Sequence, residues 1–537
     1  MSLSAAAHAD LAAALADWRG VVGEQHVRDD CATLAAASTA TFATTQRVTA
    51  VLRPGDRDQV AACLRVAQRH AVPVHPVSRG RNWGYGSRVP PRDGSVVLDL
   101  GRLTGITGYD PELGTVRVQT GVTQGQLHDF LRAHGDGHLM DPTGSTPDAS
   151  VLANALERGF GHTPYADHAD HLAGLEVVLP DGSVLRTGLA GTPGAAAAAA
   201  HRWAAGPALD GLFLQSRLGV VTSATVQLMR RPAAARSFVF SAAPGTGVAD
   251  LVDALRPLRQ TGTVGSAVHL ANAYKVVSGL RRYPWDLTGG TTPLRPQALA
   301  PLAAGLGVGP WSGSGALYGS AAQVRDAARQ VRRALRGRVA TLRFLDDRRL
   351  ALARALARRH LLPGTLGRGI DLVTPIHGLL MGRPSAHAIE SAYWRTREPF
   401  DAARAPGRDP DRDGCGLLWV SPVLPLRGRD AAAVEGIVTR VTLGHDLEPV
   451  VSLTLLTPRS AIAVVSLLFD RTVADADEQA AACAADLTAE LAAAGYHSYR
   501  PPGPARRDGT GLDEASARVV AAVRREVDPA GILSAGA

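Results

Sequence analysis

Short apolar runs separated by glycine turns characterise the chain from residue 46 to about residue 229. Valine-rich runs at 48–52 and 72–77 predict two strands. Between them, apolar side chains recur at the i, i+3, i+4, i+7 spacing of one helical face, namely Val60, Cys63, Leu64 and Ala67. The pattern therefore predicts a strand, a helix and a second strand at the start of the first domain.

The same alternation of apolar runs and glycine turns continues, and it predicts further strands at 96–100 and 116–119. Thr123 and Gln126 then have the spacing of a capping box, which opens a helix. Two strand-like runs at 174–179 and 183–186 flank a Pro-Asp-Gly turn, which predicts a hairpin. The alanine-rich stretch 191–200 is interpreted as a loop or a marginal helix without a chemical role.

The pattern changes after Arg231-Pro232, where longer helical stretches appear. Helices are predicted at 320–336, 348–359 and 512–527, and a strand at 450–456. A chain of 537 residues exceeds the size of one hydrophobic core, so at least two domains are expected. We predict a first domain over 1–235, a second over 236–490, and a return of 491–537 to the first.

Composition excludes few functions. Apolar residues make up 45% and charged residues 20%, as in ordinary globular proteins. The net charge of +8 raises the alternative of a noncatalytic basic binding protein, but the arginines are mostly scattered among acids, so no nucleic-acid partner is expected. We expect no membrane span, no secretory signal, no disulfide framework among four distant cysteines, and a cytoplasmic location.

Two glycine-rich segments, 76–86 and 150–165, are the strongest chemical signal. Glycines let the backbone approach a ligand closely and turn N–H groups toward a pyrophosphate. Neither segment has the G-x-G-x-x-G spacing of a dinucleotide fingerprint. By composition alone, both segments could equally be ordinary turns.

Taken in order, however, these segments resemble the FAD domain of the vanillyl alcohol oxidase and p-cresol methylhydroxylase family. The resemblance continues to the end of the chain through the motifs at 174–179, 210–222, 382–384, 393–395, 418–422, 469–472, 499–500 and 527–529. It implies an α+β fold of two domains, a p-cresol methylhydroxylase-type FAD-binding domain and an α+β cap over the flavin ring.

The resemblance also implies which residues hold FAD. The loop at the pyrophosphate contributes Ser78, Gly80, Arg81, Asn82, Gly84 and Gly86. The segment along the flavin contributes Ser150, Asn154, Glu157, Gly159, Gly161 and His162, and the adenine side contributes Gly219 and Val221.

Tyr85, Tyr499 and Arg500 stand at positions that resemble the family's phenolate clamp. A free phenol has a pKa of about 10, and a permanent cation with two hydroxyl donors favours its ionised form. The ionised oxygen pushes electrons to the para position, which allows hydride loss from the benzylic carbon and leaves a quinone methide. Alternatively, Tyr85 simply packs in its loop and Arg500 lies at the surface.

The sequence departs from the family pattern in two places. Ser145 stands where vanillyl alcohol oxidase has its acidic base, so Asp148 becomes the candidate base, with capping of the next helix as its alternative role. Leu417 stands where relatives attach FAD covalently, and a leucine cannot form that bond. Cys415 could form a thioether, but a buried thiol is usually inert, so noncovalent FAD is the simpler expectation.

We therefore expect an FAD-dependent oxidase or dehydrogenase of a para-substituted phenol or similar aryl substrate. The alternative within the same fold is a non-phenolic alcohol or natural-product intermediate as donor. The expected partners are a small aromatic substrate, O2 or an electron-acceptor protein, and a second copy of the chain in a homodimer.

Overall fold

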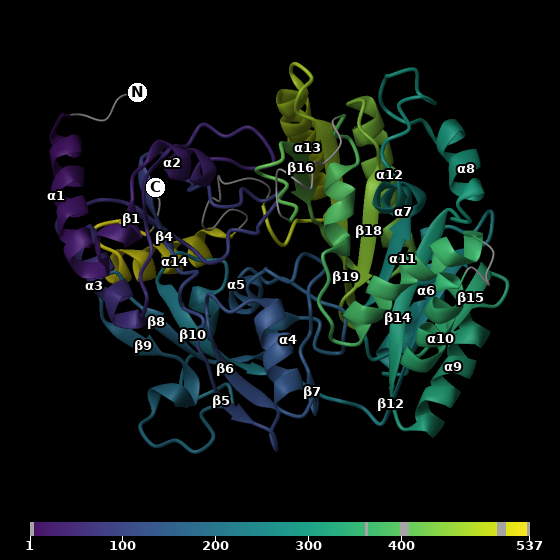
Figure 1. Cartoon of the computed structure of the whole chain (residues 1–537), viewed down its shortest axis with the longest axis horizontal. Coiled ribbons are helices and arrows are strands. Elements are labelled where there is room, and N and C mark those ends of the chain that lie inside the picture. Colours follow the sequence, from purple (N-terminus) through teal and green to yellow (C-terminus); the bar gives the residue numbers. More distant parts are fainter. Residues whose placement is uncertain (1–4, 360–363, 398–406, 502–511, 534–537) are drawn as a thin grey trace.

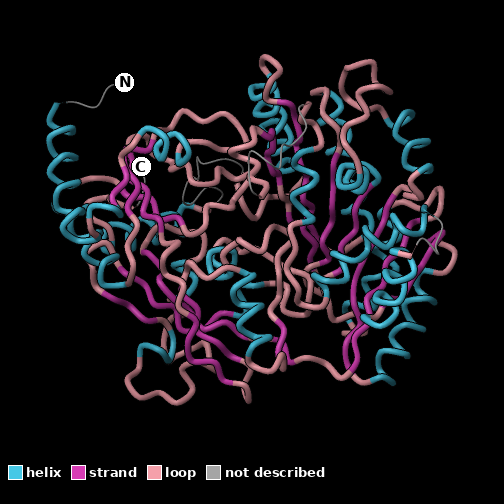
Figure 2. Tube along the Cα trace, in the orientation of Figure 1, coloured by secondary structure: helices cyan, strands magenta, loops and turns pink. Residues whose placement is uncertain are grey.

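The computed structural model describes residues 5–359, 364–397, 407–501 and 512–533. Figure 1 shows two bodies side by side, one built from the N-terminal part with the C-terminal helix, the other from the middle of the chain. Loops fill much of the region where the two bodies meet (Figure 2). The site described below is assembled from these loops.

The first sheet of the N-terminal body contains the predicted strand–helix–strand unit. Its order is β1 (Val27–Arg28), β2 (Val48–Leu52), β4 (Ser95–Asp99) and β3 (Val74–Val77), with β2 and β3 both parallel to β4. Helix α3 (Arg57–Arg69) crosses between β2 and β3 and buries the four predicted apolar side chains. Helices α1 (Ala5–Val22) and α2 (Cys31–Ala37) precede this unit.

The second sheet of this body is antiparallel. Its order is β5 (Ile106–Asp110), β6 (Thr115–Gln119), β10 (Val220–Gln227), β8 (Leu172–Val178) and β9 (Val184–Arg186). The predicted hairpin is β8 and β9, and the predicted capping box opens α4 (Gln124–Ala133). The short helix α5 (Val151–Leu156) follows, and β7 (His138–Leu139) pairs with β11 (Met229–Arg230). The alanine-rich stretch forms turns rather than a helix.

The second body is built on one large antiparallel sheet. Its described strands run in the order β15 (Val339–Leu345), β12 (Ala234–Ala242), β14 (Trp311–Gly319), β13 (Val268–Asn272), β18 (Val450–Leu455), β19 (Ser460–Asp470) and β16 (Cys415–Val420), with β17 (Val423–Pro425) also on β19. Helices α6 (Val248–Gln260), α9 (Ala321–Leu335), α12 (Gly428–Gly444) and α13 (Ala476–Ala493) share its apolar core. The other helices are α7 (Ala273–Leu280), α8 (Pro296–Gly305), α10 (Asp347–Arg358) and α11 (Gly364–Leu380).

The C-terminal segment lies against the N-terminal body, where the yellow helix α14 (Glu514–Val527) lies in Figure 1. Val523 and Val527 pack on the core of the antiparallel sheet, and Ile532 and Leu533 are buried in the core of the first sheet. The backbone N–H of Val74 donates to the carbonyl of Ile532 at 2.7 Å. The α+β class is confirmed, whereas the domain limits at residues 235 and 490 stay a prediction.

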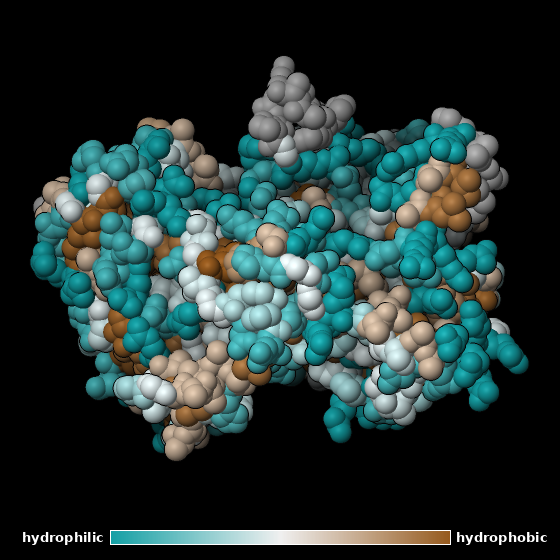
Figure 3. Space-filling model, turned by 60° about the horizontal axis from the view of Figure 1, so that its bottom comes forward, coloured by the Kyte–Doolittle hydropathy of each residue, from teal (hydrophilic) through white to brown (hydrophobic). Residues whose placement is uncertain are grey.

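The surface carries no extended apolar face in the view of Figure 3, where hydrophobic residues are scattered among hydrophilic ones. The exposed large apolar side chains come from many separate elements, for example Leu113, Leu287 and Leu352. Within the described ranges, no helix is both long enough and apolar enough to cross a membrane.

Candidate active site

The loop that follows β3 has the backbone of an anion-binding loop. Gly80, Gly84 and Gly86 have φ angles of 65°, 76° and 103°, in the left-handed region that side chains disfavour. Within the described part of the chain, the consecutive backbone amides of 79–82 donate to no protein acceptor. A row of free N–H groups fits a pyrophosphate, so these residues fit the diphosphate of FAD.

Ser78 and Ser150 are brought together by a shared hydrogen-bond acceptor. Each hydroxyl donates to the carbonyl of Thr120 at 2.6 Å. The hydroxyl of Thr120 in turn donates to the carbonyl of Val221 at 2.5 Å. Three segments predicted to surround the cofactor thus converge on Thr120, and both serine hydroxyls hold them together.

Gly84 connects the loop after β3 to the large antiparallel sheet of the second body, called the cap below. The backbone N–H of Trp419 donates to the carbonyl of Gly84 at 3.2 Å, and its indole N–H donates to the carbonyl of Trp83 at 2.7 Å. A Cβ atom on Gly84 would lie 1.8 Å from Cδ1 of Trp419. Because no side chain fits there, glycine at position 84 sets how closely the two bodies approach.

Three other predicted glycines also allow close packing. A Cβ atom at each would approach a neighbouring side chain within 3 Å: Gly159 meets Asn154 at 2.3 Å, Gly161 meets Asp141 at 2.5 Å, and Gly219 meets Val177 at 2.5 Å. Asn154 also contacts Nδ1 of His168 at 2.6 Å. These glycines are required by protein packing, whatever contact they also make with a cofactor.

The three predicted clamp residues lie together although Tyr85 is more than 400 positions from Tyr499 and Arg500. Tyr85 shares a hydrogen bond with Oγ of Ser421 at 2.7 Å, and Cζ of Arg500 lies 4.1 Å from the centre of the Tyr85 ring. Burial, followed by the neighbouring Tyr85, raises the pKa of Tyr499 well above its usual value, and Arg500 opposes this shift. Both tyrosines are half-buried and Arg500 is buried.

Arg500 is held from two sides. One of its guanidinium nitrogens donates to Oδ1 of Asn82 at 2.7 Å and pairs with Oε2 of Glu157 at 3.0 Å. Its Nε is buried and has no hydrogen-bond partner in the described ranges. Asn82 and Glu157, both predicted near FAD, therefore position the cation, and Glu157 offsets part of its charge.

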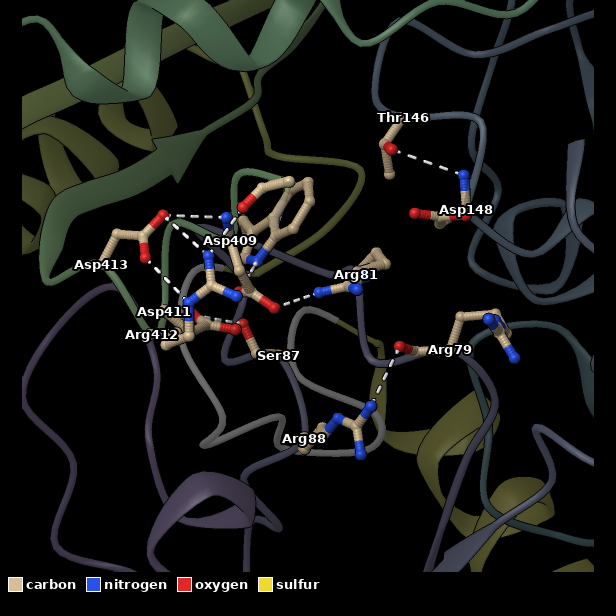
Figure 4. Close-up of polar contacts among 12 residues, drawn as sticks. Arg79, Arg81, Ser87, Arg88, Thr146, Asp148, Asp409, Asp411, Arg412 and Asp413 are labelled. Atoms are coloured by element: carbon tan, nitrogen blue, oxygen red, sulfur yellow. Dashed lines mark hydrogen bonds and ion pairs between the residues drawn. The ribbon is translucent and has the colours of Figure 1, made fainter. Parts of the chain in front are cut away.

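The glycine-rich loop after β3, called the flavin loop below, also contacts an acidic loop that precedes β16 (Figure 4). Asp409 forms an ion pair with Arg81 and accepts the indole N–H of Trp83 at 3.3 Å. Asp411 accepts the hydroxyl of Ser87 at 2.8 Å, and burial raises the pKa of this carboxyl to about 7. The charge of the predicted cofactor residue Arg81 is thus paired with a protein carboxylate.

Asp148 does not have the capping role that the sequence suggested. The N-cap of α5 is Ser150, whose Oγ accepts the backbone N–H of Ala153 at 3.0 Å. Asp148 itself is exposed, and its own amide donates to Oγ1 of Thr146 at 3.4 Å. In Figure 4 it lies on a separate loop from Arg81. Its role as the base stays a prediction.

Cys415, the candidate for covalent attachment, lies in an apolar cluster. Its side chain is fully buried among residues that include Trp83 and Tyr393. Burial raises the pKa of the thiol far above its usual value, so the reactive thiolate is disfavoured. Leu417, at the family's attachment position, is also buried. Both observations favour noncovalent FAD.

His162 lies where the flavin segment meets the cap. Its ring packs against the ring of His269 on β13, with the centres 4.3 Å apart. Its backbone N–H donates to Oδ1 of the buried Asp141 at 2.8 Å. Sequence reasoning missed Asp141, His269 and Asp411. The Asp-Pro-Asp-Arg-Asp run was a usable signal for Asp411, but nothing in the sequence marks His269.

Comparison with known proteins defines the class. Residues 48–188 match the family model described as FAD binding domain. Over 97% of this chain and 96% of the relative, the sequence is 40% identical to 1′-carboxy-chondrochloren decarboxylase of Chondromyces crocatus. It is 28% identical to the flavoprotein subunit of 4-cresol dehydrogenase [hydroxylating] of Pseudomonas putida, over 89% of this chain and 85% of that one.

The structure agrees with these sequence relationships. A crystal structure of p-cresol methylhydroxylase with substrate bound superposes with a TM-score of 0.86 at 26% identity, covering 98% of this chain and 96% of that one. Fold and site together define a two-domain flavoprotein that binds FAD. The chain belongs to the vanillyl alcohol oxidase and p-cresol methylhydroxylase family of FAD-dependent oxidoreductases.

Proposed function

We propose that this protein oxidises a para-substituted phenol, or a similar aryl substrate, at the benzylic carbon. The observation that carries the proposal is the cluster of Tyr85, Tyr499 and Arg500, in which a buried guanidinium lies over the ring of Tyr85 and close enough to Tyr499 to influence its pKa. A related flavoprotein whose name specifies 4-cresol, a para-substituted phenol, supports the substrate class.

The chemistry follows from the charge of Arg500. A guanidinium and two hydroxyl donors lower the pKa of a bound phenol, and every tenfold increase in its ionisation constant corresponds to about 1.36 kcal/mol. The phenolate then releases electron density toward the para carbon, so a hydride leaves the benzylic carbon and a quinone methide remains. FAD, when bound, supplies the two-electron acceptor for that hydride. Tyr85, Tyr499 and Arg500 orient the substrate oxygen and hold its negative charge.

A second candidate is oxidative decarboxylation of such a phenol, and the 40% identity to a named decarboxylase favours it. A carboxylate on the carbon next to the benzylic carbon can leave as CO2 from the quinone methide. The C–C bonding pair becomes the new double bond, and the ring electrons return to the phenol oxygen. The products are an alkenyl phenol, CO2 and a reduced cofactor, so charge and electrons balance.

The final electron acceptor and the assembly are also proposals. Reduced cofactor can be reoxidised by O2 or by an acceptor protein, and the relative named as a flavoprotein subunit motivates a test of the second. We also propose a homodimer, which sedimentation of the purified protein would test.

The decisive experiment is anaerobic mixing of the purified yellow protein with 4-ethylphenol or with 3-(4-hydroxyphenyl)propanoate. Bleaching of the flavin by 4-ethylphenol supports benzylic oxidation, and CO2 release with 4-vinylphenol from the acid supports decarboxylation. In Arg500→Ala, either reaction should slow by about 10- to 100-fold, the value of a hydrogen bond to a charged group. Arg231→Ala, at the surface pair with Asp136, is the control. A flavin that neither phenol bleaches would instead favour a non-phenolic donor.

A further inference from the structure

The segment after α5 leads from the phenol clamp to the cap. The ring of Phe160 lies 6.2 Å from the ring of Tyr499, measured between centres. Two residues later, His162 packs against His269 of β13. Two residues of extended chain span roughly 7 Å, comparable to a phenol ring with its first side-chain carbon. A phenol held by Tyr499 with its para side chain directed along this segment would place that side chain near His162.

The hydrogen bonds of His162 fix its tautomer. Nδ1 lies 3.0 Å from the carbonyl oxygen of Pro142, which can only accept, so Nδ1 carries the hydrogen. Nε2 is left with a lone pair. This nitrogen has no hydrogen-bond partner in the described part of the chain. Nε2 of His269 also lacks a partner but is fully buried, whereas Nε2 of His162 is partly accessible to solvent. A Cβ atom on Gly144 would lie 3.8 Å from this nitrogen, so the glycine leaves room beside the proton acceptor.

The surroundings keep this imidazole neutral. Burial lowers the pKa of His162 below its usual value, and the nearby Asp141 carboxylate only partly opposes the shift. The titratable and charged groups that face the two packed rings are Asp141, His168 and Arg259. The position of His162 is fixed by Asp141, which accepts the backbone N–H of His162 at 2.8 Å and that of Thr163 at 3.0 Å.

The loop that precedes this segment offers few candidate bases, and Asp148 stays a separate prediction for that role. From Pro142 to Pro147 the sequence contains no acid, Ser145 stands at the family's base position, and Asp148 is exposed. We propose that His162 is a catalytic base, and that its Nε2 accepts the proton of the water that attacks the quinone methide. This inference rests on the proposed benzylic oxidation. The C–O bond forms at the benzylic carbon, the proton moves to Nε2, and the electron pair returns to the phenol oxygen.

The test separates hydride loss from water addition in the FAD-loaded His162→Gln and His162→Asn proteins. With 4-ethylphenol under anaerobic conditions, formation of 1-(4-hydroxyphenyl)ethanol should fall by about 100-fold or more relative to the amount of flavin bleached, the usual contribution of a general base. Added imidazole should restore part of the alcohol yield. In the wild type, alcohol formation should fall as the pH drops through the pKa of His162, and this dependence should vanish in the variants.

His445→Gln is the matched control, because His445 pairs with Asp486 on the surface of the cap. Unchanged alcohol yield and pH profile in both His162 variants would overturn the inference, as would equal loss of bleaching and product, which indicates a structural role. Decarboxylation without any hydration in the wild type would also overturn it, since CO2 loss needs no proton acceptor. If no phenol bleaches the wild-type flavin, the proposed function fails first, and the two failures are thereby distinguished.

Discussion

The guanidinium of Arg500 lies over the ring of Tyr85, with Cζ 4.1 Å from the ring centre, and it pairs at the same time with the carboxylate of Glu157 at 3.0 Å. An aromatic face attracts a cation without neutralising its charge, so the stacked guanidinium can still attract an anion. The carboxylate, by contrast, competes with any anion that binds Arg500. In the proposed phenolate clamp, substrate binding would therefore depend on the balance between Glu157 and the substrate oxygen.

Replacement of Glu157 by Gln should strengthen phenolate binding. Without the competing carboxylate, Arg500 lowers the pKa of a bound phenol further, and affinity at neutral pH should rise by about 3- to 10-fold. Titration of the phenolate absorbance of bound 4-nitrophenol measures both effects, with the exposed Glu24→Gln as control. Weaker binding would mean that Glu157 chiefly holds Arg500 in position.

In the acidic loop, Asp411 and Asp413 should make the stability of the protein depend on pH in opposite directions. The pKa of Asp411 is raised to about 7, so its unfolded form ionises at lower pH and stability is lost as the pH rises from about 4 to 7. Asp411→Asn should therefore stabilise the protein by as much as about 4 kcal/mol at pH 8, at about 1.36 kcal/mol per pKa unit, and the gain should shrink toward pH 4. Unfolding midpoints across this range test the prediction.

Asp413 provides the matched control for that series. Burial alone would raise the pKa of Asp413, but hydrogen bonds from Arg412 and Tyr393 outweigh it and lower the pKa. A lowered carboxyl pKa stabilises the fold above the unfolded pKa, and this stabilisation is lost as the pH falls. Asp413→Asn should thus destabilise the protein at pH 8 and matter less in acid. A stability change of the same sign in Asp411→Asn and Asp413→Asn would contradict the opposite pKa shifts of the two carboxyls.

The buried ion pair between Arg395 and Glu448 should dominate the stability of the cap. Glu448 accepts from Nε and a second nitrogen of Arg395 at 2.9 and 2.6 Å, and also from Tyr283 and the amide of Leu294. Glu448→Ala leaves a buried cation unpaired, which costs about 3–5 kcal/mol. Glu490→Ala, at an exposed pair with Arg440, should cost at most about 1 kcal/mol. Denaturant unfolding of both variants compares them, and equal losses would contradict this interpretation.

Gly84→Ala should loosen FAD without disturbing the helices of the cap. The added methyl group cannot fit against Trp419, so the flavin loop or β16 must shift. We expect at least about a tenfold loss of FAD affinity, the effect of about 1.4 kcal/mol. Gly436→Ala is the control, because nothing lies within 4 Å of a Cβ atom there. Cofactor released on gel filtration gives the readout, and full retention by Gly84→Ala would contradict the prediction.

The sequence by itself determined the local elements and the family. The 3.6-residue spacing of Val60, Cys63, Leu64 and Ala67 is a property of consecutive residues, and it placed α3 correctly. Thr123 and Gln126 fixed the start of α4 for the same reason, because a capping box involves only neighbours in the chain. The glycine-rich segments, interpreted by resemblance, predicted the FAD fold and its cofactor.

Only the tertiary structure decided which residues meet. His269 and Asp411 stand on elements of the second body, and no local pattern links them to His162 or Ser87. The cap of α5 also needed the fold, since both Asp148 and Ser150 are good capping residues and only the path of the chain selects Ser150. Local patterns report the forces between near neighbours, whereas the site depends on contacts across hundreds of residues that packing alone brings together.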